Sequence, residues 1–212
     1  IRAVFGQYPH HDARYIPFEI TDLRARASNP LLGALEWLLR LPQQRVVFSE
    51  LRDLLEVPAI ALRFGIDSHA LPRLTAWMAG AGIRWGLDGA QRDAMELGAC
   101  GEQNTGWFGL RRMLLGYAGG AALDLAWASI EPYPEVGGLE AELAGCLADF
   151  LGALRRWQQL ASSPASPAEW AVRGRALLQD MVAAQDEIDR QTLSAMVDAL
   201  GRWQDACDQA EF

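Results

Sequence analysis

The chain contains 212 residues, half of them apolar, and its formal net charge is −8. All 19 basic residues are Arg, so the chain lacks the Lys that a GxxxxGK[ST] phosphate-binding loop or a Schiff base requires. Residues 1–106 carry 11 Arg and 12 acidic residues, a net charge of −1, whereas residues 107–212 carry 8 Arg and 15 acidic residues, a net charge of −7. A domain that binds nucleic acid by itself is usually basic, so this charge argues against independent nucleic-acid binding.

Membrane segments and metal ligands are also not indicated. No apolar run approaches the ~18 residues that span a bilayer, and no signal peptide is visible, so we expect a cytoplasmic protein. His10 and His11 adjoin Asp12, but nothing downstream completes a ligand set, so a solvated loop is favoured and we expect no metal or cofactor. Three cysteines lie far apart without a CxxC pair, which fits a reducing compartment better than a disulfide framework or zinc site: Cys100, Cys146 and Cys207.

The N-terminal stretch differs from the rest. The chain starts at Ile1 without an initiator Met and stops at Phe212 just behind a helical pattern, so we expect a piece of a longer protein. Residues 14–20 (RYIPFEI) mix aromatic and β-branched residues with polar ones, which predicts a strand, with Pro17 tolerated at an edge. We therefore expect a strand-containing segment over residues 1–27, followed by a mainly α domain over residues 28–212.

Short helices are predicted through the first half of that domain. Asn29-Pro30 is a typical helix start, and the helix it opens ends before Pro42. Ser49 is expected to cap the next helix. Val57-Pro58 interrupts that helix, and the pattern then predicts a helix over 58–64 and another from about 71 to 80.

The second half is predicted to contain longer helices. Residues 83–104 look irregular, with a short helical stretch near 92–97. Apolar residues at helical spacing then predict further helices over about 107–117, 139–160, 168–184 and 187–208.

Two segments suggest DNA contacts. Residues 49–80 could form a helix-turn-helix, but the longer helix that would serve as its recognition helix offers Arg73 as its only Arg, and helical packing is the favoured interpretation. Arg111 and Arg112 lie beside Trp107, a combination found in single-strand channels. The spacing of Trp107, Leu110, Leu114 and Tyr117 instead predicts a buried face, with the arginines outward.

Arg84 and Trp85 form a similar pair in a Gly-flanked loop. They could contact a ligand, although a Trp that pins the loop to the core is the favoured interpretation. The candidate DNA-binding residues are therefore Arg84, Trp85, Arg111 and Arg112. No catalytic set is found, because the three His residues are too few and too poorly placed for a triad.

Four phrases, in their order and spacing, resemble the RecC family, the gamma subunit of exodeoxyribonuclease V in the bacterial RecBCD complex. They are IPFEITDLRARASNPLL (16–32), LPQQRVVFSELRDLLEVPAIALRFGID (41–67), AGIRWGLDG (81–89) and QNTGWFGLRRMLLGYA (103–118). The resemblance covers residues 1–160 well and the last fifty weakly. One point departs from the family pattern: Gly106-Trp107-Phe108-Gly109 stands where a Trp-Arg-Phe-Gly order is expected, so no role of that Arg is carried over.

The resemblance implies a fold and a role. RecC proteins resemble superfamily 1 helicases that have lost their ATPase motifs, which agrees with the missing Lys. The piece would be an inserted 2B-like helical domain (28–212), with a remnant of the neighbouring 2A-like core (1–27). The complex unwinds and degrades double-strand ends during repair by homologous recombination, and RecC channels single strands between RecB-type and RecD-type partners. Nothing in these residues assigns Chi recognition to this piece.

The resemblance therefore predicts a non-catalytic scaffold and DNA-channel domain. Its acidic second half would contact partner subunits, and its Arg-bearing first half would contact single-stranded DNA. A stand-alone helix-turn-helix DNA-binding regulator is the alternative, and salt-dependent duplex binding would favour it. An independent nuclease would require metal-dependent cleavage, which we expect to be absent.

Overall fold

The computed structural model describes Arg14 and residues 29–119 and 130–209. Its helices are α3 (Pro30–Leu39), α4 (Phe48–Leu55), α5 (Pro58–Arg63), α6 (Leu71–Gly80), α7 (Gly89–Ala94), α8 (Gly106–Gly119), α9 (Glu142–Ala161), α10 (Pro167–Met181) and α11 (Glu187–Gln209). Short 3₁₀ turns lie between some of them: η1 (Leu41–Gln43), η2 (Gly98–Cys100) and η4 (Gly138–Ala141). The described residues contain no strand, so the mainly α prediction is confirmed, while residues 15–20 of the predicted strand lie outside the described residues.

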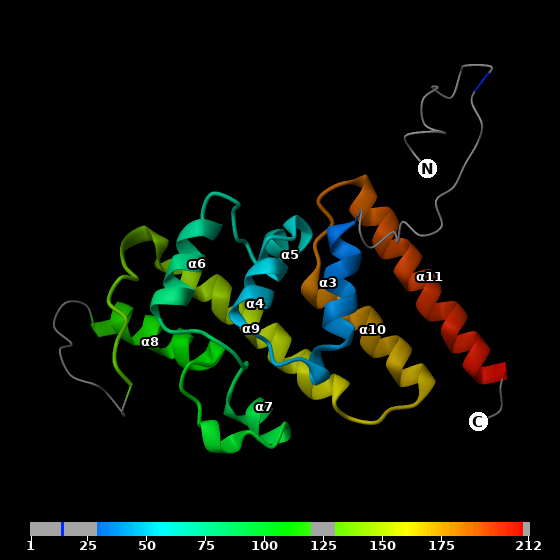
Figure 1. The fold of residues 1–212 in the computed structure, drawn as a ribbon. Helices are drawn as coiled ribbons and strands as arrows, with labels where there is room; N and C mark the ends of the chain where they lie inside the picture. Colours follow the sequence, from blue (N-terminus) through cyan, green and yellow to red (C-terminus); the bar gives the residue numbers. More distant parts are fainter. Residues whose placement is uncertain (1–13, 15–28, 120–129, 210–212) are drawn as a thin grey trace.

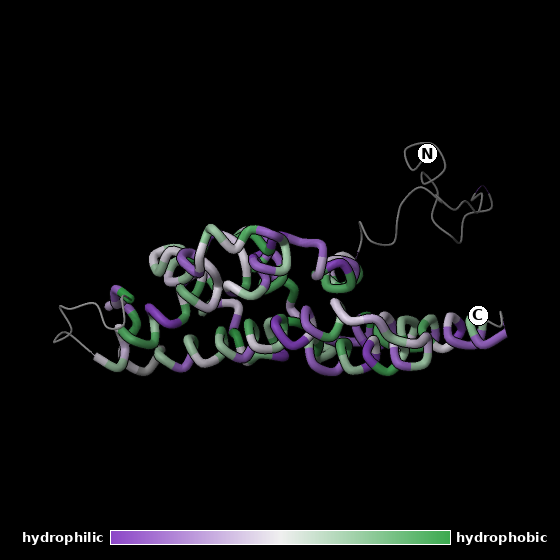
Figure 2. The backbone as a smooth tube through the Cα atoms, turned by 90° about the horizontal axis from the view of Figure 1, so that it is seen from below, coloured by the Kyte–Doolittle hydropathy of each residue, from purple (hydrophilic) through white to green (hydrophobic). Residues whose placement is uncertain are grey.

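The helices form two layers (Figure 1). Helices α8, α9, α10 and α11 follow one another side by side in one layer, and α3, α4, α5 and α6 lie across them. Figure 2 shows these layers edge-on, as a flat, elongated body. Contacts between the layers join α6 to α8, η1 to α9, α5 to α10 and α3 to α11. Each helix therefore needs one apolar face only, as the 3.6-residue spacing predicts.

Helix α9 provides the centre of the core. Its inward side chains are almost completely buried, and they include Leu147, Phe150, Leu151 and Leu154. Phe64 from the other layer meets Phe150 edge to face, with the ring centroids 5.4 Å apart. The buried Trp157 Nε1 donates to the carbonyl oxygen of Leu38 at 2.6 Å, which fixes α3 over the C-terminal half of α9.

Most predicted helix starts agree with the structure, but one is wrong. Asn29 accepts a hydrogen bond from the backbone N–H of Leu31 at 3.0 Å and caps α3. Ser49 does not cap α4, because the helix already begins at Phe48. The Glu50 carboxylate accepts from the N–H of Val47, and the N–H of Phe48 donates to the carbonyl oxygen of Arg84. A contact with a distant segment therefore sets this boundary.

The predicted buried face of α8 is also wrong in part. Leu110 is buried, but Leu114 and Tyr117 are exposed. The helix instead turns Gly106, Gly109, Met113 and Gly116 toward the core, together with Leu110. A Cβ atom at residue 109 would overlap the side chain of Ile83, and one at residue 116 would overlap the backbone carbonyl group of Tyr133. Glycine lets these neighbours approach the helix axis, so apolar spacing alone misjudged the face.

Candidate nucleic-acid interface

The candidate site is built on residues 81–105, which we call the α6–α8 connection. Its two ends lie together, since the N–H groups of Arg84 and Trp85 both donate to the carbonyl oxygen of Asn104, at 2.9 and 3.2 Å. The chain reverses through Gly82 and Gly86, whose φ angles of +85° and +81° favour glycine. The connection also reaches the other layer through an isolated antiparallel bridge between Val47 and Trp85.

Arg92 holds the connection together from inside. Its side chain is almost fully buried, and its Nη1 donates to the carbonyl oxygens of Gly101 and Gln103 at 2.6 and 2.9 Å. Its Nη2 donates to the carbonyl oxygen of Trp85 at 2.9 Å, and its Cζ lies 3.8 Å from the centroid of the Trp85 ring. Burial lowers the pKa of this guanidinium below its ordinary value. Arg92 therefore supports the loop.

Arg84 and Trp85 differ in what they present to solvent. Arg84 is exposed, and its Nη1 donates to the carbonyl oxygens of Ala79 and Ile83 at 3.0 and 2.9 Å. Trp85 is half-buried, stacks with Arg92 and joins the bridge to Val47. This geometry is that of a Trp that pins the loop, and Arg84 is the more accessible member of the pair.

Arg111 and Arg112, adjacent on α8, also have different surroundings. Arg111 is exposed and forms an ion pair with Glu102. Arg112 donates from Nη1 to the carbonyl oxygen of Ala81 and from Nε to that of Glu131, both at 2.8 Å. Its side chain is only 19% exposed, so it joins the α6–α8 connection to residue 131. Arg111 is the one that faces outward.

A hollow of about 260 Å³ opens beside Arg111, which we call the Trp107 hollow. Arg155 of α9 spans part of its rim and pairs with Asp88, with Nε 2.9 Å from Oδ2. Its Cζ lies 5.7 Å from the centroid of the Trp107 ring. The lining residues are Asp88, Gly89, Ala90, Glu102, Trp107, Arg111 and Arg155.

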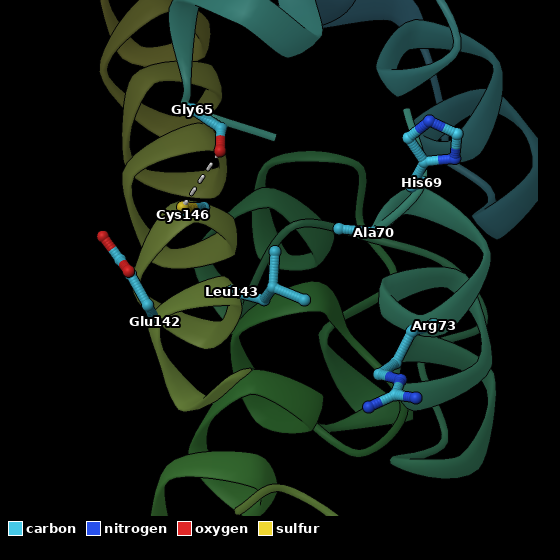
Figure 3. A pocket seen from close by; sticks show the side chains of 7 residues that line it. All are labelled: Gly65, His69, Ala70, Arg73, Glu142, Leu143 and Cys146. Carbon is cyan, nitrogen blue, oxygen red and sulfur yellow. Dashed lines mark hydrogen bonds between the residues drawn. The ribbon is translucent and has the colours of Figure 1, made fainter. Parts of the chain in front are cut away.

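A second hollow, of about 330 Å³, lies between α6 and α9 (Figure 3). His69 and Arg73 stand on one wall, and Glu142 and Cys146 stand on the other. Burial, helped by the nearby acidic residues, raises the pKa of the Cys146 thiol, which makes it a poorer nucleophile at neutral pH. None of the predicted site residues lines this hollow.

The remaining sequence expectations concern a helix-turn-helix, a metal site and membrane segments. Helices α4, α5 and α6 occupy the predicted helix-turn-helix segment, and Leu74, Trp77 and Met78 of α6 are buried in the common core. Among the described residues, no group of His, Cys, Asp or Glu side chains could hold a metal ion. His10, His11 and Asp12 lie outside those residues. No helix in the described part of the chain is long and apolar enough to cross a bilayer.

Sequence reasoning missed two arginines of this region. The sequence places Arg92 only in a short helical stretch, because nothing in its local pattern marks a buried cation. Arg155 stands next to Arg156 on α9, and only the packing of α9 against α8 places it above Trp107. Three glycines share the buried face of α8, and their helical spacing in the sequence would have predicted close packing on that face: Gly106, Gly109 and Gly116.

Comparison with known proteins extends the resemblance seen in the sequence. A model of the RecBCD enzyme subunit RecC fourth domain matches residues 28–212, so the likeness includes the last fifty residues. The chain is 42% identical over 204 residues to the RecBCD enzyme subunit RecC of Escherichia coli K12, which covers 96% of this chain and 18% of that protein. It is 32% identical over 187 residues to the RecC subunit of Haemophilus influenzae, covering 88% of this chain and 16% of that protein. The RecC subunit of Mycolicibacterium smegmatis is 33% identical over 160 residues, covering 76% of this chain and 15% of that protein. The chain thus spans less than a fifth of the length of these relatives.

Proposed function

The chain belongs to the RecC family, as a fourth-domain region of that RecBCD subunit, and we propose that it acts there as a non-catalytic scaffold that forms part of a DNA channel. The match over residues 28–212 is the observation that carries this proposal. The parent assembly would be an exodeoxyribonuclease V acting in double-strand-break repair by homologous recombination. This chain would supply helices that line the DNA channel, while the partner subunits would supply the helicase and nuclease activities.

We assign residues 28–212 to a 2B-like helical domain and residues 1–27 to the neighbouring 2A-like core. The start of the domain match at residue 28 supports this division. Among the described helices, all but α7 contribute apolar side chains to one core or pack partly against it, as expected of a rigid insertion.

Helix α11 is the proposed contact for RecB-type or RecD-type partners. None of its residues is buried, although Leu193, Met196 and Leu200 pack partly against the core. Its exposed positions combine large apolar side chains with acidic ones, and Trp203 and Ile188 are 43% and 65% exposed. Aromatic residues are enriched at the centre of protein interfaces, and polar residues surround them at the rim. A partner with a basic surface would complement this helix.

Single-stranded DNA is the proposed ligand of the opposite end of the body. Arg84 and Arg111 are exposed there, while Arg92 and Arg112 hold the loop that carries them. Two exposed arginines are too few for tight binding by this chain, so the remaining phosphate contacts would come from the partner subunits.

One experiment separates the two contacts. The full-length RecC-type subunit that contains this chain would be purified with its RecB-type and RecD-type partners in two variant forms. Asp198→Arg with Asp205→Arg, on the exposed face of α11, should weaken co-purification because it reverses the charge of the proposed interface. Arg84→Glu with Arg111→Glu should leave assembly intact and weaken single-strand binding.

The salt dependence of DNA binding makes the second expectation quantitative. Each phosphate contact to a single strand contributes about 0.7 to the slope of log affinity against log salt, so losing two should lower the slope by about 1.4. Arg156→Glu, an exposed charge reversal on α9, serves as the control and should change neither readout. Unchanged assembly in the α11 variant would contradict the interface, and an unchanged slope would contradict the DNA contact. Preferential binding of duplex DNA by this chain alone would favour the helix-turn-helix alternative.

A further inference from the structure

We propose that the Trp107 hollow receives one unpaired base of a single-stranded nucleic acid, stacked against the indole ring. This inference rests on the DNA contact proposed above and assigns one base of the strand to a specific binding site. It differs from that contact in kind, because the hollow would recognise the base and not the phosphate.

The size of the hollow suits one flat ring system. Its volume of about 260 Å³ lies just below the ~300–1,000 Å³ typical of pockets for drug-sized ligands. Its lining includes Gly89 and Ala90, the two smallest residue types, at the start of α7. A base splayed out of a strand would enter such a space, and a base pair would not.

Trp107 supplies the stacking surface. The residue is half-buried in the first turn of α8, and its N–H donates to the carbonyl oxygen of Leu87 at 2.9 Å, which fixes the backbone beneath the ring. Its Nε1 is buried and has no hydrogen-bond partner among the described residues, so a ligand in the hollow would meet the ring, over which Arg155 lies, and not the indole N–H. Stacking on an aromatic face accepts every base, because every base has a π-face.

Arg155 lies over this ring, with its Cζ 5.7 Å from the centroid, and Arg111 also lines the hollow. Each of the two arginines already has an acidic partner. Arg155 pairs with Asp88, and Arg111 pairs with Glu102, so the four groups sum to no net charge. A phosphate held inside the hollow would need surplus positive charge, which this lining lacks, whereas the exposed Arg111 would meet a backbone phosphate outside the hollow. Guanidinium donors beside carboxylate acceptors instead match the mixed donors and acceptors along the edge of a base.

The test compares two oligonucleotides that differ only in their bases. The full-length RecC-type subunit that contains this chain, assembled with its RecB-type and RecD-type partners, would be titrated with a labelled single-stranded 12-mer and with a 12-mer of the same length whose central positions are abasic. Both carry the same phosphates, so phosphate contacts cancel. We expect the base-bearing strand to bind at least about fivefold more tightly, as one base–aromatic stack predicts.

Variants locate this preference in the hollow. Trp107→Ala and Arg155→Gln should remove it, while Trp107→Phe, which keeps a ring, should retain part of it. Arg156→Gln is the matched control, because the neighbouring Arg156 is exposed on α9 and does not line the hollow. Since Arg155 is 45% exposed at its side chain, Arg155→Gln should fold normally even if Trp107→Ala does not, and thermal unfolding would check this.

Each outcome bears on the proposal. Equal binding of both strands, or a preference that survives Arg155→Gln and Trp107→Ala, would overturn the base site and leave the phosphate contact standing. Binding of neither strand would overturn the base site together with the proposed DNA contact. A preference lost in both hollow variants and kept in Arg156→Gln would support it.

Discussion

Arg92 carries an unusual share of the local structure. One guanidinium satisfies carbonyl oxygens of Trp85, Gly101 and Gln103, which belong to separate turns of the same connection. The Arg92 side chain is buried, although Gly101 and Gln103 themselves lie at exposed positions. The exposed Arg84 and the hollow beside Arg111 both depend on the shape that this residue maintains.

Replacing Arg92 should therefore unfold the connection. Arg92→Met keeps the length of the side chain but removes the donor to the carbonyl oxygens of Trp85, Gly101 and Gln103, at about 1–3 kcal/mol for each oxygen that water does not reach. We expect the free energy of unfolding to fall by about 3 kcal/mol in urea denaturation. Arg156→Met, at an exposed position, should change it by less than about 0.5 kcal/mol. A loss below about 1 kcal/mol for Arg92→Met would mean that water replaces the guanidinium.

At the scale of elements, the glycine face of α8 decides how the layers meet. Gly109 admits Ile83, and Gly116 admits the backbone of residues 133 and 134. Tyr133 then lies against Gly80 of α6, and its hydroxyl donates to Glu135 at 2.8 Å. Burial first, and this hydrogen bond second, raise the pKa of Tyr133 to about 12. The exposed Leu114 and Tyr117 point away from this packing.

For this reason, two Gly→Ala changes should shift the free energy of unfolding in opposite directions. Gly116→Ala would force a Cβ atom into the backbone of Tyr133, which cannot yield as a flexible side chain does, so we expect a loss of about 2 kcal/mol or more. Gly145→Ala on α9 meets nothing within 4 Å and should gain about 0.5–1 kcal/mol from helix propensity. Thermal unfolding of both variants measures the two effects. If Gly116→Ala changed the stability by the same amount and in the same direction as Gly145→Ala, α8 would be able to move away from residue 133.

At the scale of the whole molecule, the two layers share one core. The buried residues form a single cluster that extends from α3 to α10, and inter-layer hydrogen bonds reinforce it. The Trp157–Leu38 bond crosses the layers, as does the one from Asn29 Nδ2 to Thr192 Oγ1 at 2.8 Å. Neither layer could bury its apolar face alone.

Unfolding of the whole chain should consequently be cooperative. We expect a single transition in urea, with circular dichroism and tryptophan fluorescence giving the same midpoint. Trp157→Phe removes the donor to Leu38 and should lower the free energy of unfolding by about 1–3 kcal/mol without splitting the transition. Leu62→Ala, on an exposed position of α5, is the control. Two separate midpoints would show that the layers unfold independently.

Much of the fold could be predicted from the sequence. Asn29-Pro30, Val57-Pro58 and the apolar spacing of α9 lie within single elements, and such local signals gave the helical class and the order of helices. The missing Lys excluded a phosphate loop without any structure. The four phrases were enough to indicate the RecC family, which the comparisons confirm.

The candidate site depended on contacts that the sequence does not display. Arg155 and Trp107 are 48 positions apart and meet only because α9 packs on α8. Arg92 is buried because distant carbonyls surround it, and Arg112 turns inward because residue 131 returns to α8. Periodicity and capping report on neighbours within one or two turns, whereas burial and side-chain partners depend on which elements the chain brings together. The sequence therefore determined the elements and the family, and the tertiary structure alone decided which arginines support the fold and which are exposed to solvent.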